Sequence, residues 1–259
     1  MVDSKAQSMV FHFTVFLFSA VFYGMLMVLL QEPIVPSWSW YSSTISVFVM
    51  LSMVASRKLT EKWYPAFLPS VVSFSTLLLL SLIDVVFEQR VFVWVATGLF
   101  YAALLGIYRL KLSPGDETAR ALLNTAAFAS LFFTYAAAYG LYLNYTVPLA
   151  LLMFVFFLAT AIIAFQTLFW AGHDDFLEVL LTVLALGTIL GELIWVIHFW
   201  PVGYLTVGAS MLIFFYLLWH LAFDFFRGTV NGKKIFIETG ILLILLALLL
   251  VTSPWRVRV

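Results

Sequence analysis

The sequence predicts an all-α, polytopic transmembrane helical bundle with about nine spans. Hydrophobic residues make up 64% of the 259 positions and charged residues only 10%, against roughly 45–50% and 25% in an average soluble domain. The charges gather in a few short clusters separated by apolar runs long enough to cross a bilayer. Lys and Arg residues also concentrate on alternate connections, as they do in membrane proteins. Lipid is therefore the expected solvent for most of the chain.

Each span is delimited by polar clusters, prolines and aromatic boundaries, because a helix needs about 20 apolar residues to cross the hydrocarbon core. The first apolar run exceeds a signal-peptide core and no small-x-small cleavage site follows it, so we expect it to be a retained span. The second span has the shortest apolar core. The expected spans cover residues 9–30, 37–55, 64–86, 91–108, 121–142, 148–170, 176–198, 201–223 and 235–251.

The distribution of positive charge predicts an orientation. With nine spans, ten of the thirteen Lys and Arg residues fall in the N-terminal tail and in the second, fourth and eighth connections, which share one side. Cytoplasmic loops carry the excess of Lys and Arg, so the N-terminus is expected in the cytoplasm and the C-terminus outside. Every connection is short, and residues 1–259 are expected to form a single transmembrane domain.

Short motifs recur at nearly constant spacing along the chain. Tyr23-Gly24 in the first span matches Tyr139-Gly140 in the fifth, and Gly98 matches Gly208. One explanation is a parallel tandem repeat, in which residues 9–110 correspond to residues 121–223 and the span 235–251 is an addition. The other is chance similarity among helices rich in Leu, Phe and Val, and both explanations stay open.

Composition excludes several kinds of chemistry. Formal net charge is zero, so nothing favours a nucleic-acid partner. The chain has no cysteine, which rules out disulfides, thiolate nucleophiles and Cys-ligated metal centres. No phosphate-binding Gly-rich loop, His-Glu-x-x-His or Gly-x-Ser-x-Gly motif occurs. The cofactor is unknown, and the expected partners are the lipid bilayer and other membrane protein subunits.

Ionisable residues at membrane depth are candidate functional groups, because burying a charge there is costly. Glu192 is the deepest on these span boundaries, and we expect it to face the protein interior. It follows Gly187-Thr188-Ile189-Leu190-Gly191, a GxxxG spacing that allows close approach of a second helix. His198, Asp84 and Glu88 are further candidates nearer the outer surface. The spacing of Asp84 and Glu88 places them on one face of the third span. Solvation at the headgroups is the favoured explanation for Asp84, Glu88 and His198, whereas a functional and a structural role stay equally open for Glu192.

A second group of candidates lies near the cytoplasmic ends of the seventh and eighth spans, and its residue types suit a divalent metal. His220 and Asp224 are four residues apart, on one side of a helix. Helix capping is the alternative explanation for the acidic members that open the seventh span. The candidate metal ligands are His173, Asp174, Asp175, Glu178, His220 and Asp224.

Three functions remain open on the sequence. The first is a non-enzymatic small permease-like transporter or a membrane-embedded subunit, favoured by the repeat and by the missing catalytic motifs. The second is an intramembrane metal-dependent hydrolase or lipid-modifying enzyme with its His/Asp/Glu site at the cytoplasmic face. The third is a structural partner whose Phe-rich helices pack against other membrane proteins.

Overall fold

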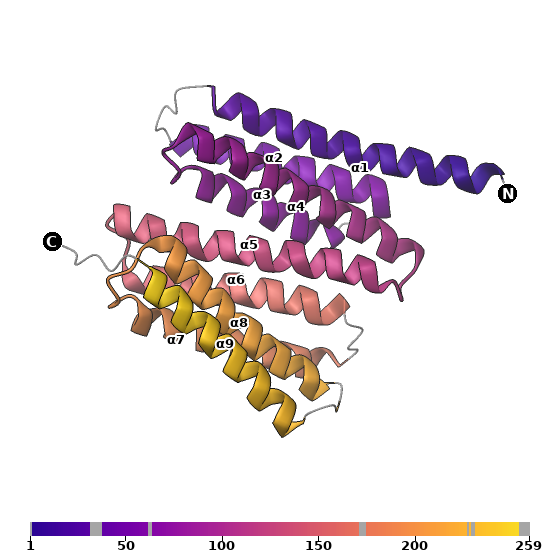
Figure 1. Ribbon diagram of the computed structural model, residues 1–259. Helices are drawn as coiled ribbons and strands as arrows, with labels where there is room; N and C mark the ends of the chain where they lie inside the picture. Colours follow the sequence, from indigo (N-terminus) through magenta and orange to yellow (C-terminus); the bar gives the residue numbers. More distant parts are fainter. Residues whose placement is uncertain are drawn as a thin grey trace. The chain divides into compact units, whose positions relative to one another are not determined.

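The computed structural model describes residues 2–31, 38–61, 64–170, 175–226, 228 and 231–253. These residues form nine α-helices and one 3-10 turn, η1 (Tyr64–Ala66), and every regular element among them is helical (Figure 1). The helices are α1 (Val2–Leu29), α2 (Trp38–Thr60), α3 (Phe67–Leu80), α4 (Val86–Leu112), α5 (Glu117–Asn144), α6 (Leu149–Trp170), α7 (Phe176–Ile197), α8 (Tyr204–Phe226) and α9 (Gly232–Thr252). The all-α prediction is confirmed.

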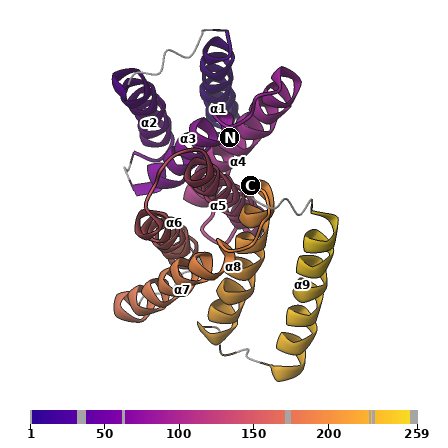
Figure 2. The same cartoon turned by 90° about the vertical axis from the view of Figure 1, so that its left-hand side faces the viewer.

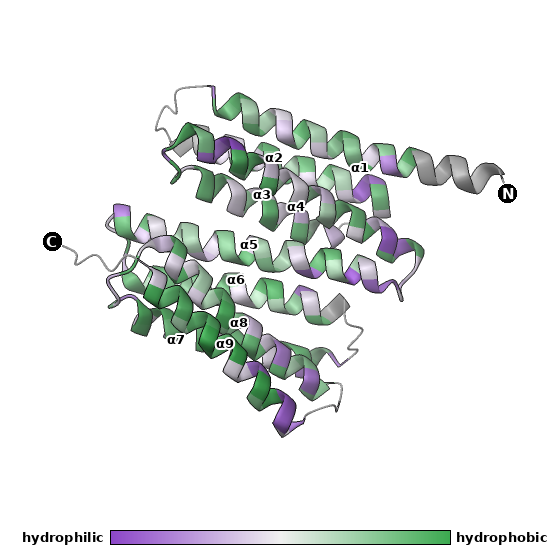
Figure 3. Cartoon of the chain, viewed as in Figure 1, coloured by the Kyte–Doolittle hydropathy of each residue, from purple (hydrophilic) through white to green (hydrophobic). Residues whose placement is uncertain are grey.

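Among the described residues, seven helices are long and apolar enough to cross a membrane, namely α1 and α4 to α9. Figure 3 shows hydrophobic residues along most of their lengths and hydrophilic ones at ends such as the first turn of α9. A soluble protein would hide such surfaces, whereas lipid solvates them. The protein is therefore a multi-pass integral membrane protein.

Helix α3 is shorter than the span expected at residues 64–86. It ends at Leu80, and a turn follows in which the Ser81 hydroxyl bonds the Leu78 carbonyl at 2.7 Å. The chain then runs without regular structure to Val85, and α4 begins at Val86. The 14 residues of α3 cover on the order of 21 Å at the usual helical rise, less than the hydrocarbon core.

The chain divides into two compact units, residues 1–130 and 131–259, with α5 contributing to both. In the first unit, α1 packs on α2 and α4, and α3 packs on α2 and α4. Phe22 of α1 stacks on Phe100 of α4, with ring centroids 4.3 Å apart, and meets Phe48 of α2 edge-on. Ser52 of α2 and Ser73 of α3 lie 2.9 Å apart and bond the same carbonyl, that of Pro69. Hydroxyl pairs of this kind join helices where lipid supplies no hydrophobic driving force.

In the second unit, α6 and α7 form an intimate pair because two glycines line their contact. A Cβ atom on Gly187 would lie 3.0 Å from the Phe157 carbonyl oxygen, and one on Gly191 would lie 3.2 Å from that of Met153. The close approach expected from the GxxxG spacing is confirmed. Helix α8 packs on α7 and α6, and Gly208 of α8 lies against Ala136 of α5.

Within the described residues, helix α9 packs on α8, and Figures 1 and 2 both place the two side by side. Of the residues of α9, only Leu246 is buried within the described chain. Polar contacts join the two helices near both ends. At one end the Thr206 and Ser253 hydroxyls lie 2.7 Å apart, and at the other lies a group of charged side chains.

Candidate functional site

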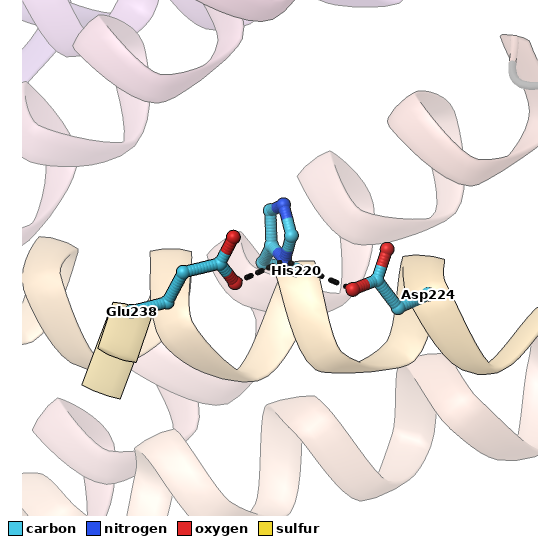
Figure 4. A group of neighbouring side chains, drawn as sticks. All are labelled: His220, Asp224 and Glu238. Atoms are coloured by element: carbon cyan, nitrogen blue, oxygen red, sulfur yellow. Dashed lines mark ion pairs between the residues drawn. The ribbon is translucent and has the colours of Figure 1, made fainter. Parts of the chain in front are cut away.

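The charged group at the α8–α9 contact comprises His220, Asp224, Lys234 and Glu238, called here the α8–α9 cluster. Figure 4 shows three of them, His220, Asp224 and Glu238. Each helix supplies two residues spaced four apart, and this spacing sets them on one helical face. The connection between the helices is short, and Asn231 starts α9 by accepting a hydrogen bond from the Lys233 amide at 3.0 Å. The end of α8 and the beginning of α9 therefore lie together.

Asp224 is the most enclosed member of the α8–α9 cluster, with 6% of its side chain exposed. Lys234 Nζ donates to both of its carboxylate oxygens, at 3.1 Å to Oδ1 and 2.9 Å to Oδ2. A buried carboxylate without such a partner would cost several kcal/mol on general grounds. Lys234 therefore compensates the charge of Asp224.

His220 lies between the two carboxylates, as Figure 4 shows. Its Nδ1 is 3.1 Å from Glu238 Oε2 and 3.7 Å from Asp224 Oδ2. Lys234 Nζ also lies 3.9 Å from Glu238 Oε1. Among the described side chains of the cluster, two carboxylates therefore lie next to one ammonium and one imidazole.

His220, Asp224 and Glu238 form the one group of potential metal ligands found among the described residues. One ligand atom from each lies within 4.8 Å of the others. Ligands of a tetrahedral zinc ion lie roughly 3.4 Å apart, with bonds of about 2.1 Å, so modest side-chain rotation would bring the three into range. One nitrogen and two oxygens suit zinc, manganese or iron. Lys234 competes with a metal ion for Asp224, because its ammonium donates hydrogen bonds to both carboxylate oxygens.

A small pocket adjoins the α8–α9 cluster on the same two helices. Apolar side chains form most of its wall, while His220 and Glu238 contribute the ionisable groups. Its lining residues are Leu217, His220, Leu221, Ile235, Glu238 and Thr239. His220 and Glu238 therefore border this pocket, whereas the enclosed Asp224 is not among its lining residues.

The other candidate metal ligands are not brought to this cluster within the described chain. His173 and Asp174 lie outside the described residues. Asp175 caps α7, accepting from the Leu177 and Glu178 amides at 3.0 and 3.3 Å, as the capping alternative predicts. Glu178 is exposed in the first turn of α7, where the helix dipole stabilises a negative charge.

The expectation that Glu192 faces the protein interior is wrong, because its side chain is exposed. The buried stripe of α7 includes Leu190, Gly191 and Ile194. Successive residues of a helix are separated by about 100°, so Glu192 projects to one side of the glycine contact. A GxxxG motif fixes which face packs and says nothing of the residue that follows it.

The three outer candidates also have separate surroundings. His198 caps the end of α7, and its Nδ1 lies 2.6 Å from the Trp195 carbonyl oxygen. The Tyr139 hydroxyl donates to the backbone carbonyl of His198 at 3.5 Å. Asp84 lies in the connection after α3 and Glu88 in the first turn of α4, and both are exposed. The expectation that they share one face of a third span is therefore wrong, since the chain leaves the helix at Leu80.

Sequence reasoning missed Lys234 and Glu238. Lys234 lies in α9, although the span expected from the sequence begins only at residue 235. Glu238 is an acidic residue inside the last apolar run, six residues after the helix begins and therefore on the order of 9 Å along it. An acidic residue inside an apolar run, four residues after a lysine, is the signal that could have identified Glu238. The spacing of Lys234 and Glu238 is the same as that of His220 and Asp224.

Comparison with known proteins gives a family and no further relative. No curated protein and no solved structure matches the chain. One family model, described as "Protein of unknown function (DUF5656)", matches residues 49–253, which include every member of the α8–α9 cluster. The match covers well over half of the sequence, and the chain therefore belongs to the DUF5656 family.

Proposed function

We propose that this protein is a small, non-enzymatic permease-like transporter that binds a divalent cation at the α8–α9 cluster. The observation that carries the proposal is the grouping of His220, Asp224 and Glu238, whose ligand atoms lie within 4.8 Å of one another in a membrane helix pair. Ionisable residues inside membrane spans usually mark ion or substrate pathways, because placing them there is costly. The cation is the cargo or the coupling ion.

Helix pairing supports the transporter class. In the first unit the pairs are α1 with α2 and α4, α3 with α2 and α4, and α2 with α4. Shifted by four helices, each pair has a counterpart. Helix α6 pairs with α7 and α8, and α7 with α8; α5 meets α6 through Tyr135 and Thr160, 2.6 Å apart, and meets α8 through Ala136 and Gly208. Parallel repeats of this kind recur among secondary transporters.

An orientation completes the proposal. If each of the nine helices crosses the bilayer, the short α3 included, ten of the thirteen Lys and Arg residues lie on the same side as the N-terminus. On the positive-inside rule that side is the cytoplasm, and the C-terminus lies outside. The α8–α9 cluster would then lie near the cytoplasmic ends of its two helices.

Uptake by reconstituted protein tests the proposal. Purified protein in liposomes loaded with a zinc-sensitive or manganese-sensitive dye should admit Zn²⁺ or Mn²⁺ faster than empty liposomes. Asp224→Asn should remove the uptake, since it keeps the shape of the side chain and removes the ligand charge. Glu178→Gln is the matched control, because Glu178 is an exposed carboxylate of the same unit. Uptake that survives Asp224→Asn, or wild-type liposomes no faster than empty ones, would refute the transport proposal.

A metal-dependent enzyme is the second candidate, and the same three ligand types favour it. The small pocket bordered by His220 and Glu238 adjoins such a centre. Metal that is bound in a fixed ratio but never carried across the membrane would favour the enzyme. Obligate co-purification with another membrane protein would instead indicate a membrane-embedded subunit.

A further inference from the structure

We infer that Lys234 is a built-in cation of the α8–α9 cluster, which occupies the site at rest and must leave it before a divalent metal can bind. The inference rests on the proposed cation site and adds the element that controls its occupancy. Its basis is the geometry of Asp224, whose two oxygens both accept hydrogen bonds from Lys234 Nζ. An ammonium and a metal ion cannot share this position, because like charges at such distances repel strongly.

The two partners differ in their freedom to move. Asp224 is enclosed, with 6% of its side chain exposed, whereas Lys234 is 44% exposed and stands near the beginning of α9. A lysine ammonium sits on a flexible four-carbon stem and favours water strongly. Lys234 can therefore swing toward the aqueous side while Asp224 stays in place.

Charge gives the direction of the exchange. Within the α8–α9 cluster itself, with the imidazole neutral as in the form that ligates metal, the two carboxylates carry two negative charges and Lys234 carries one positive charge. Replacing the ammonium by a divalent ion neutralises the three ligands completely. No covalent bond changes, and one cation leaves the site as another enters. A monovalent metal would gain no such advantage over the lysine.

The affinity of Zn²⁺ for the purified protein tests this exchange. Lys234→Gln removes the competing ammonium, and we expect Zn²⁺ to bind about ten- to hundredfold more tightly than to the wild type in titration calorimetry, the range that one charge-assisted hydrogen bond represents. Lys234→Arg keeps the charge and should not tighten binding. Lys233→Gln is the matched control, because Lys233 is the exposed neighbour in the sequence. Equal affinities in wild type and Lys234→Gln would overturn the inference while leaving the cation site intact.

A second measurement uses the wild-type protein, so it does not depend on the folding of a variant. An amine-reactive reagent should modify Lys234 slowly in metal-free protein and severalfold faster when Zn²⁺ is added, while modification of Lys233 stays unchanged in the same mass spectra. Unchanged labelling of Lys234 despite measured Zn²⁺ binding would refute the exchange alone. Absence of Zn²⁺ binding in both wild type and Lys234→Gln would refute the exchange and the proposed cation site together.

Discussion

Gly187 of α7 and Phe157 of α6 meet where no side chain fits, since a Cβ atom on Gly187 would lie 3.0 Å from both the carbonyl oxygen and a ring carbon of Phe157. The backbone oxygen cannot retreat without moving α6. In a bilayer, where lipid tails are as apolar as the helices, this fit supplies the packing energy that hydrophobic burial supplies in water.

Gly187→Ala should therefore destabilise the fold by about 1–3 kcal/mol, the usual cost of overpacking. Gly98→Ala is the control, because a Cβ there meets nothing within 4 Å. Alanine is the better helix former by up to about 1 kcal/mol, so this control should be neutral or stabilising. The free energy of unfolding in mixed micelles measures both, and equal shifts of the same sign would contradict the packing argument.

The connection between α4 and α5 should confer a pH dependence on stability through Asp116. Hydrogen bonding from the Ala119 amide, assisted by Arg109, whose Nε lies 2.8 Å away, and by the Thr118 amide, holds the pKa of Asp116 below its ordinary value of 3.8. A carboxyl with a lowered folded pKa stabilises the fold above the unfolded value, and this contribution is lost as the pH falls through the folded one.

Thermal unfolding in detergent between neutral pH and roughly pH 3 measures this contribution. The melting temperature of the wild type should fall more steeply below about pH 4 than that of Asp116→Asn, which retains a capping oxygen but no titration. Glu117→Gln, one residue further along and exposed, should keep the steepness of the wild type. Parallel curves for wild type and Asp116→Asn would show that the carboxylate adds no such stability.

The proposed orientation can be checked with single cysteines, because the chain contains none. Ser113 lies in the connection after α4 and Tyr145 follows α5, and both side chains are exposed. With the N-terminus in the cytoplasm, an impermeant thiol reagent added outside intact cells should label Tyr145→Cys and spare Ser113→Cys. The reverse pattern would invert the topology.

Glu192 on the exposed side of α7 gives a prediction about lipid contact. Glu192→Leu should leave the free energy of unfolding unchanged or raise it, since a carboxylate at the bilayer centre costs at least about 2.5 kcal/mol and less nearer the interface. Leu190→Gln, on the buried stripe of the same helix, should clearly lower the free energy of unfolding. A loss of more than about 1 kcal/mol with Glu192→Leu, measured in the same micelles, would indicate that another helix covers this residue.

The sequence predicted well those features that depend on length and local pattern. Apolar runs set the helices, and the spacing of Gly187 and Gly191 predicted a tight helix pair. The position of Glu192 around α7 could not be derived in this way, because in lipid both faces of a helix are apolar and periodicity no longer distinguishes inside from outside. The end of α3 at Leu80 is likewise hard to place, because Leu82, Ile83, Val85 and Val86 continue the apolar pattern around Ser81 and Asp84.

The candidate site shows the same limit in a different form. His220 and Asp224 were identifiable, because four-residue spacing on one helix is local information. Their partners Lys234 and Glu238 belong to the next helix, and the facing of two helices depends on the turn between them. Spacing along the chain does not encode how α9 is rotated about its axis, and this rotation sets which side of α9 meets α8.

Helix α9 has a consequence for biosynthesis. Only Leu246 is buried within the described chain, and the named contacts with α8 are the Thr206–Ser253 pair and the charged side chains near the opposite end. An α-helix satisfies its backbone hydrogen bonds internally, so α9 needs no contact with α8 to cross the bilayer. Until α9 emerges from the ribosome, Asp224 lacks Lys234, and the α8–α9 cluster is completed only when α9 has been synthesised.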